Sequence, residues 1–178
     1  MSMETRSFND MDLEVRSNGD GRTICGILVP YNVEQRIHAS LTEVFRKGAF
    51  ADVIRAAHRV KLLSGHETRK FPLGRATMLR EDENGLYGEL KISKTRAGDE
   101  ALELIRDGAL DQLSIGFQPL KDTRRKDGVV ERLKAHLAEV SLVTFGAYGD
   151  LAAVSAVRDI EETPNMAAAR AILEGLRK

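Results

Sequence analysis

Cysteine is nearly absent from this sequence of 178 residues, which contains only Cys25. A single cysteine excludes an internal disulfide framework and a cysteine-rich zinc site, and it is compatible with a reducing compartment. Long apolar runs are also missing, because no segment reaches membrane-spanning length and residues 1–12 are polar and charged, unlike a secretion signal. We therefore expect a soluble intracellular protein with no membrane association, in which Cys25 packs in the core.

An excess of charge of either sign is absent too. The 27 basic side chains balance the 27 acidic ones, and neither kind forms a long block. This balance argues against a nucleic-acid-binding surface, which needs clustered lysine and arginine. The sequence also lacks a glycine-rich phosphate loop, an HExxH helix, an EF-hand loop and paired cysteines, so we predict no cofactor and no metal site. We expect the partner to be a protein or a small molecule.

Short segments rich in alternating apolar residues dominate what is present, and they predict strands. Hairpins are predicted at 13–29 and 73–92, the second with a turn in which Asn84-Gly85 supplies a positive φ. Further strands are predicted at 36–45, 60–63, 113–117, 129–133 and 137–145, a charged loop at 121–127, and helices at 48–57, 95–107 and 164–176. Seven or eight strands joined mainly as hairpins predict an α+β fold of mainly antiparallel β type. We expect a closed or partly closed β-barrel with two or three helices packed outside.

The length fits one domain with one core. We predict a flexible N-terminus at 1–12, a β-barrel domain at 13–158, and a polar linker with a C-terminal helix at 159–178.

One strand offers a candidate nucleophile. In it Leu113, Ile115 and Phe117 alternate with Ser114 and Gly116, so the three apolar side chains are expected in the core and the Ser114 hydroxyl on the opposite face. A G-x-S-x-G elbow is missing, so an α/β-hydrolase is not indicated. A solvated serine on a half-buried strand would show the same pattern.

A nucleophilic serine needs a base and a third group that orients the base. His66 follows the predicted strand 60–63 and Gly65, at a strand end from which a side chain can reach a cleft. His136 is the competing histidine, whereas we expect His38 and His58 at the surface. Glu139 lies in an apolar strand, where a charge is expensive unless it is paired. If that strand has no bulge, Glu139 and His136 face opposite sides, which leaves them as alternatives.

Several segments, in order and spacing, resemble the prohead maturation proteases of tailed bacteriophages. The most specific are Leu-Ser-Ile-Gly-Phe at 113–117 and Glu-Val-Ser-Leu-Val-Thr-Phe at 139–145, preceded by the strand-end His66. The others are 47–50, 62–65, Gly74, 84–86, Thr95 with Gly98, and 108–112, so that the resemblance covers roughly 13–150. The family is related to the herpesvirus assemblins, whose fold is a mostly antiparallel β-barrel surrounded by helices.

The resemblance implies that Ser114 is the nucleophile, His66 its base and Glu139 the acidic third member. In the herpesvirus relatives a second histidine takes the third role, so His136 is the alternative. The implied function is a serine endopeptidase that processes the scaffold region of the major capsid protein, and also itself, inside the assembling procapsid in the host cytoplasm. The sequence leaves open a homo-oligomer. A non-catalytic capsid assembly or scaffold module with the same fold is the second hypothesis, and hydrolysis of a small ester is disfavoured.

Overall fold

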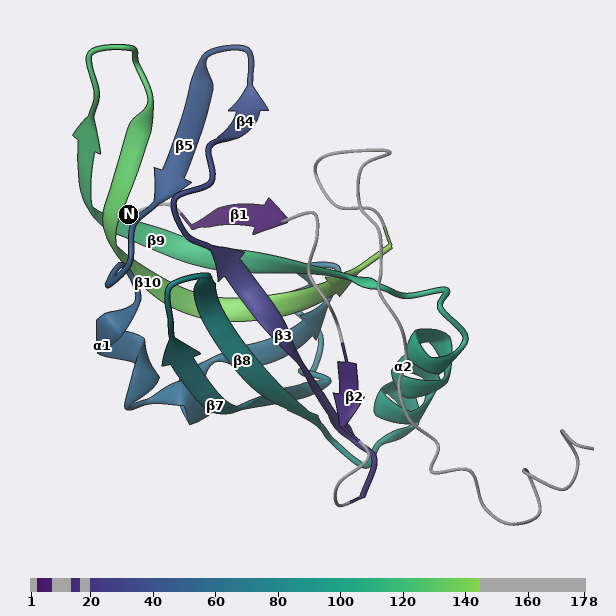
Figure 1. The fold of residues 1–178 in the computed structure, drawn as a ribbon. Helices are drawn as coiled ribbons and strands as arrows, with labels where there is room; N and C mark the ends of the chain where they lie inside the picture. Colours follow the sequence, from purple (N-terminus) through teal and green to yellow (C-terminus); the bar gives the residue numbers. More distant parts are fainter. Residues whose placement is uncertain (1–2, 8–13, 17–19, 145–178) are drawn as a thin grey trace, which may run out of the picture.

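One strongly curled β-sheet, a half-barrel, makes up most of the structure (Figure 1). A computed structural model describes residues 3–7, 14–16 and 20–144, and the statements below concern these residues. The ten strands are β1 (Glu4–Ser7), β2 (Glu14–Arg16), β3 (Thr23–Pro30), β4 (Gln35–His38), β5 (Leu41–Phe45), β6 (Lys61–Ser64), β7 (Gly74–Glu81), β8 (Gly85–Ile92), β9 (Gln112–Arg124) and β10 (Val130–Val143). The helices are α1 (Ala51–Ile54), the 3-10 helix η1 (Ala57–Arg59) and α2 (Arg96–Arg106). The predicted linker and C-terminal helix lie outside the described residues.

The strand order is β1-β9-β10-β6-β7-β8-β3-β2, with β5 pairing with both β10 and β4. Only the pairs of β10 with β5 and β6 are parallel in the described sheet, which confirms the mainly antiparallel class. The strands β1 and β2 lie at the two ends of this order although few residues separate them. In a flat sheet the first and last of eight strands would lie about 34 Å apart. The chain from the end of β1 at Ser7 to the start of β2 at Glu14 has seven residue steps, which reach about 25 Å at most. The sheet therefore has to curl.

The predicted hairpins are present, but one turn forms differently. β2 pairs with β3 and β7 with β8, both antiparallel. Asn84 and Gly85 are not among the described residues with positive φ. Instead, the Asp82 carboxylate accepts hydrogen bonds from the backbone N–H of Asn84 at 2.8 Å and of Gly85 at 3.2 Å. The predicted positive φ was wrong because the aspartate side chain closes this turn.

The two helical regions of the described residues lie where the sequence places them. Thr95 caps α2 by accepting a hydrogen bond from Gly98 N–H at 3.1 Å, and Gly108 follows with a φ of +74°. The helix predicted at 48–57 divides into α1 and η1, since Ala56 and Arg59 donate to carbonyls three residues back.

The strands β9 and β10 form one long ribbon, where we predicted a charged loop at 121–127 and two separate strands. The charged residues up to Arg124 remain paired with β10. Because an exposed ribbon needs no apolar face, its charged composition does not exclude strand pairing. Irregularities in the register, including one between Leu137 and Glu139, explain why the apolar alternation is interrupted.

The core lies inside the curled sheet. Three phenylalanines meet there: the rings of Phe45 and Phe50 stack with centroids 5.4 Å apart, and Phe117 packs edge-on against Phe45 at 5.2 Å. Cys25 is buried, as predicted.

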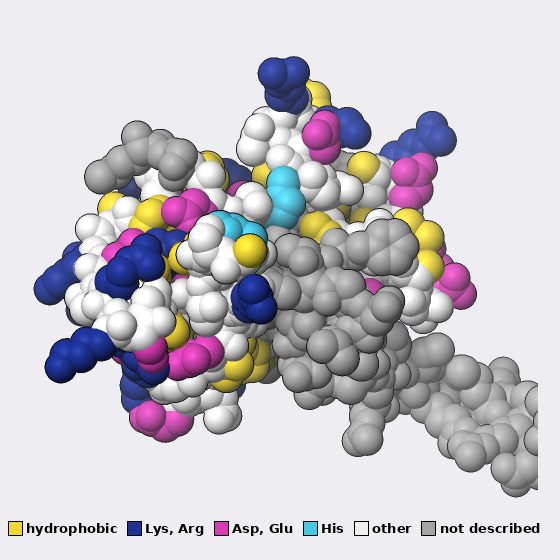
Figure 2. Space-filling view, turned by 90° about the horizontal axis from the view of Figure 1, so that it is seen from above, with side chains coloured by type: hydrophobic (Ala, Val, Ile, Leu, Met, Phe, Trp, Pro, Cys, Tyr) yellow, Lys and Arg dark blue, Asp and Glu magenta, His cyan; other side chains and the backbone are white. Residues whose placement is uncertain are grey.

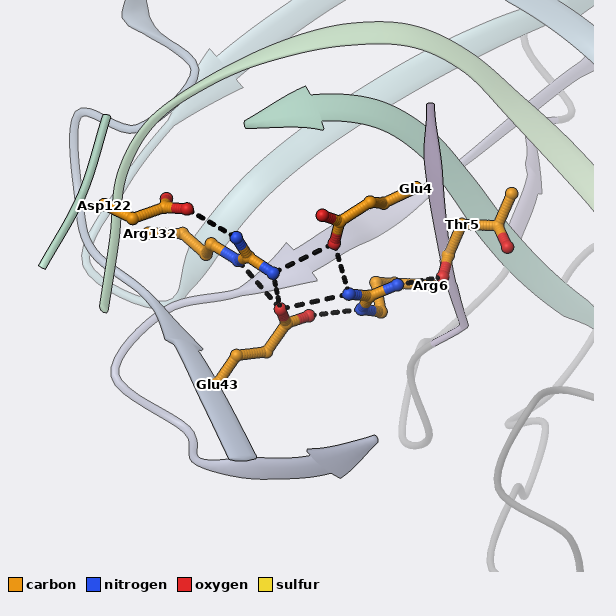
Figure 3. Close-up of polar contacts among 6 residues, drawn as sticks. All are labelled: Glu4, Thr5, Arg6, Glu43, Asp122 and Arg132. Atoms are coloured by element: carbon orange, nitrogen blue, oxygen red, sulfur yellow. Dashed lines mark hydrogen bonds and ion pairs between the residues drawn. The ribbon is translucent and has the colours of Figure 1, made fainter. Parts of the chain in front are cut away.

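The prediction of a flexible N-terminus was wrong for Glu4–Ser7, which pairs with β9 as strand β1. A buried ion network fixes this strand (Figure 3). Glu43, 1% exposed, binds Arg6 and also Arg132, whose Nε is 2.8 Å from Oε2 of Glu43. The outer carboxylates of Glu4 and Asp122 complete the network, 2.9 and 2.6 Å from Arg132. Burial alone lowers the pKa of Arg132, but the surrounding carboxylates outweigh it and raise that pKa.

Candidate active site

The Ser114 side chain lies on the face of β9 opposite the core. Leu113, Ile115 and Phe117 are buried in the core cluster, as the alternation predicted. Ser114 is only 1% exposed, because it is also covered on its own face. Its Oγ lies 2.7 Å from Nε2 of His66.

His66 reaches β9 from a left-handed turn after β6. Gly65 and His66 have φ values of +56° and +61°. Two hydrogen bonds to β10 hold this turn: Gly65 N–H donates to the carbonyl of Leu142 at 2.8 Å, and His66 N–H donates to Oγ of Ser141 at 3.0 Å. A left-handed histidine is strained, by about 1–3 kcal/mol, and such strain persists only where the surroundings fix it. The turn therefore orients the His66 ring.

Glu139 occupies the other side of the same ring. Its Oε1 lies 2.7 Å from Nδ1 of His66, and its Oε2 accepts a hydrogen bond from Oγ of Ser141 at 2.6 Å. Glu139 is 5% exposed, so the carboxylate is buried with partners on both oxygens. With Glu139 accepting at Nδ1, the neutral ring carries its proton there and Nε2 is free to accept the Ser114 proton.

A bulge between Leu137 and Glu139 changes the parity of β10. Glu139 lies opposite Gly116, and His136 lies opposite Gln118, so both face the side of the sheet that carries Ser114. The expectation that Glu139 and His136 face opposite sides assumed a strand without a bulge, so it does not hold for β10. Nevertheless, among the described residues it is Glu139 that contacts the His66 ring, and His136 is exposed farther along the ribbon.

Two residues of the site were missed at the level of sequence. Ser141 bonds both Glu139 and the His66 backbone, and the signal was available, since a serine two residues after a buried glutamate on one strand shares its face. Gly116 makes room for the carboxylate: a Cβ atom there would lie 2.2 Å from Oε1 of Glu139. No local sequence pattern predicts that a glycine is required at position 116.

The row of Ser114, His66 and Glu139 has the connectivity of a nucleophile, a general base and an orienting acid. The remaining histidines lie elsewhere: His58 is exposed, and Nδ1 of His38 is 3.1 Å from Oγ of Ser40 at the surface.

Other kinds of site find no support in the part of the chain that the structure describes. No group of three or more His, Cys, Asp and Glu side chains there is arranged to hold a metal ion. No helix in that part is long and apolar enough to cross a membrane. Acidic and basic side chains are interspersed on the face shown in Figure 2.

Comparisons with known proteins agree with these observations. Residues 11–166 match the family described as caudovirus prohead serine protease. The chain is 27% identical over 163 residues to the prohead protease of Enterobacteria phage HK97, covering 89% of this chain and 70% of that protein. The capsid assembly protease of bacteriophage T4 has a similar fold, with a TM-score of 0.56 at 14% identity, covering 79% of this chain and 96% of that one.

Proposed function

This chain belongs to the family of caudovirus prohead serine proteases, and we propose that it is a serine endopeptidase whose catalytic residues are Ser114, His66 and Glu139. The observation that carries the proposal is the continuous row of two 2.7 Å contacts from Oγ of Ser114 through the His66 ring to Glu139. A binding or scaffold module has no need of such a row. The proposal also includes a barrel of the herpesvirus-assemblin type, which the curled, mostly antiparallel sheet supports.

In the first half of the reaction, Nε2 of His66 takes the proton from Ser114 as its Oγ attacks a peptide carbonyl. Glu139 stabilises the resulting imidazolium and keeps the ring from rotating. His66 then gives the proton to the leaving amine as the C–N bond breaks, which leaves an acyl group on Ser114. In the second half, His66 takes a proton from water, the hydroxide attacks the acyl carbon, and the proton returns to Ser114.

The proposed substrates are the scaffold region of the major capsid protein and the chain itself, cleaved inside the assembling procapsid in the host cytoplasm. The family and the HK97 relative support this assignment. Self-cleavage is proposed in the polar segment 159–164.

The test is incubation of the purified chain with its cognate capsid precursor, followed by gel analysis and mass spectrometry. The Ser114→Ala variant should lose processing by at least about 10³-fold. Ser40→Ala is a matched control, because Ser40 also lies beside a histidine nitrogen but at the surface. Equal processing by wild type and Ser114→Ala would refute the assignment in favour of the non-catalytic module.

A further inference from the structure

A cavity of about 350 Å³ lies between the α1–η1 segment and the β9–β10 ribbon. Its apolar lining includes Val53, Leu120 and Leu137, and its polar lining includes Arg59 and His136. This volume lies within the range of pockets that bind small molecules or single side chains. Leu120 is 46% exposed, so part of the apolar wall is open to a ligand.

His136, which lines the cavity, faces the same side of the sheet as the candidate active site. Along this face Ser141 lies opposite Ser114, Glu139 opposite Gly116, and His136 opposite Gln118. The bulge after Leu137 is what brings Glu139 to this side, while His136, before the bulge, lies on it through its pairing with Gln118. A peptide laid along the outside of the ribbon at Ser114 would therefore continue toward the cavity.

The spacing between the two sites can be worked out from strand geometry. Four residues separate Ser114 from Gln118, the residue opposite His136, and a strand rises about 3.3 Å per residue, so the offset is about 13 Å. An extended peptide has the same rise. Its side chain about four residues from the cleaved bond would reach the cavity.

The charges around the cavity do not cancel. Asp52 is paired with Lys134, with Oδ2 and Nζ 2.7 Å apart. Arg59 is exposed, and no carboxylate of the described residues pairs with it. The remaining polar groups, Arg59 and His136, are both able to donate to an anion, and a wall of apolar side chains strengthens such a bond by excluding water.

We propose that this cavity is a substrate subsite that takes an acidic side chain, bound by Arg59 and His136, about four residues from the cleaved bond. Glutamate fits best, since its methylene groups can pack on Val53 and Leu120 while its carboxylate reaches Arg59. The inference rests on the proposed endopeptidase function and adds the chemistry of its substrate.

The test measures binding separately from cleavage. Overlapping peptides covering the scaffold region of the cognate capsid precursor are arrayed, each with Glu, Leu or Lys scanned through every position, and probed with the Ser114→Ala variant. We expect one position in the bound peptides at which Glu binds at least 10-fold more tightly than Lys. Arg59→Glu in the same background should reverse this preference toward Lys.

Arg55→Glu is the matched control, because Arg55 is an exposed arginine of the same segment that does not line the cavity. It should keep the preference for Glu. The absence of any acid-preferring position, a stronger preference for Leu, or an unchanged preference in Arg59→Glu would overturn the subsite. Labelling of Ser114 by a fluorophosphonate in the wild type depends on Ser114, His66 and Glu139 and not on the cavity. Absence of labelling would therefore show that the protease proposal fails, independently of the peptide array.

Discussion

Replacement of Gly116 by alanine tests the link between Glu139 and His66 without changing either residue. In most strands a glycine-to-alanine change stabilises the protein by about 0.4–1 kcal/mol, because it restricts the unfolded chain. Here the new Cβ would lie 2.2 Å from Oε1 and 2.9 Å from Cδ of Glu139. Contact at van der Waals distance requires the carboxylate to retreat by about 1 Å.

Such a retreat breaks the 2.7 Å contact between Glu139 and His66, since a separation of about 3.7 Å is no longer a hydrogen bond. The same displacement of the buried Glu139 strains the hydrogen bond that its carboxylate accepts from Ser141. Loss of one charged hydrogen bond costs about 1.5–3 kcal/mol of stability. Loss of the orienting carboxylate lowers kcat by about 10⁴ in other triads, so a displaced one should lower it by about 10²–10⁴, or about 3–5 kcal/mol in the barrier.

The assay pairs kcat and KM for cleavage of the capsid precursor with thermal unfolding. Gly88→Ala is the control, because its Cβ would lie 2.5 Å from the Leu28 side chain in the core, away from the site. Gly88→Ala should lower Tm and leave kcat near the wild-type value, whereas Gly116→Ala should lower both. A folded Gly116→Ala protein with wild-type kcat would refute the role given to Glu139.

Three further predictions concern the rest of the chain. Glu43→Gln leaves two buried guanidinium groups without their shared charge and should destabilise the fold by about 3–5 kcal/mol in urea titrations; an unchanged midpoint would contradict it. Burial and the Glu81 hydrogen bond raise the pKa of Tyr31, so stability is intact below pH 10 and falls above it by up to about 1.4 kcal/mol per pH unit. Tyr31→Phe should flatten that slope. Mass spectrometry should find cleavage within 159–164 in wild type but not in Ser114→Ala, and an intact wild-type chain after days argues against self-cleavage.

Local sequence patterns predict those parts of the fold that depend only on residues close together in the sequence. The alternation around Ser114 gives the correct face, and the Thr95 cap with Gly108 bounds α2. In contrast, β1 was missed because its residues are polar. Arg6 belongs to a strand only because Glu43, 37 residues away, neutralises it in the interior. A partner that distant leaves no local signal.

The candidate site shows the same division. The position of His66 at a strand end follows from the sequence, but its contact with Ser114 depends on the left-handed turn at Gly65 and on two hydrogen bonds to β10. The choice between Glu139 and His136 depended on parity, and parity depended on a bulge that apolar alternation does not reveal. In each case the sequence does not reveal the register of the strands, because register is fixed by the pairing between strands that lie far apart in the sequence.

The bulge at Ala138 connects the catalytic row to the cavity. In an unbulged ladder continuing from the pair of Leu137 with Phe117, Glu139 would lie opposite Ile115 and point into the core. A buried, unpaired carboxylate there would be strongly destabilising. With one extra residue, Glu139 turns to the Ser114 face while Val140 takes the core position opposite Ile115. Since the residues before the bulge keep their own register, His136 remains on that face too. A single inserted residue therefore orients the base through Glu139 and places the proposed acid-binding subsite along the same surface.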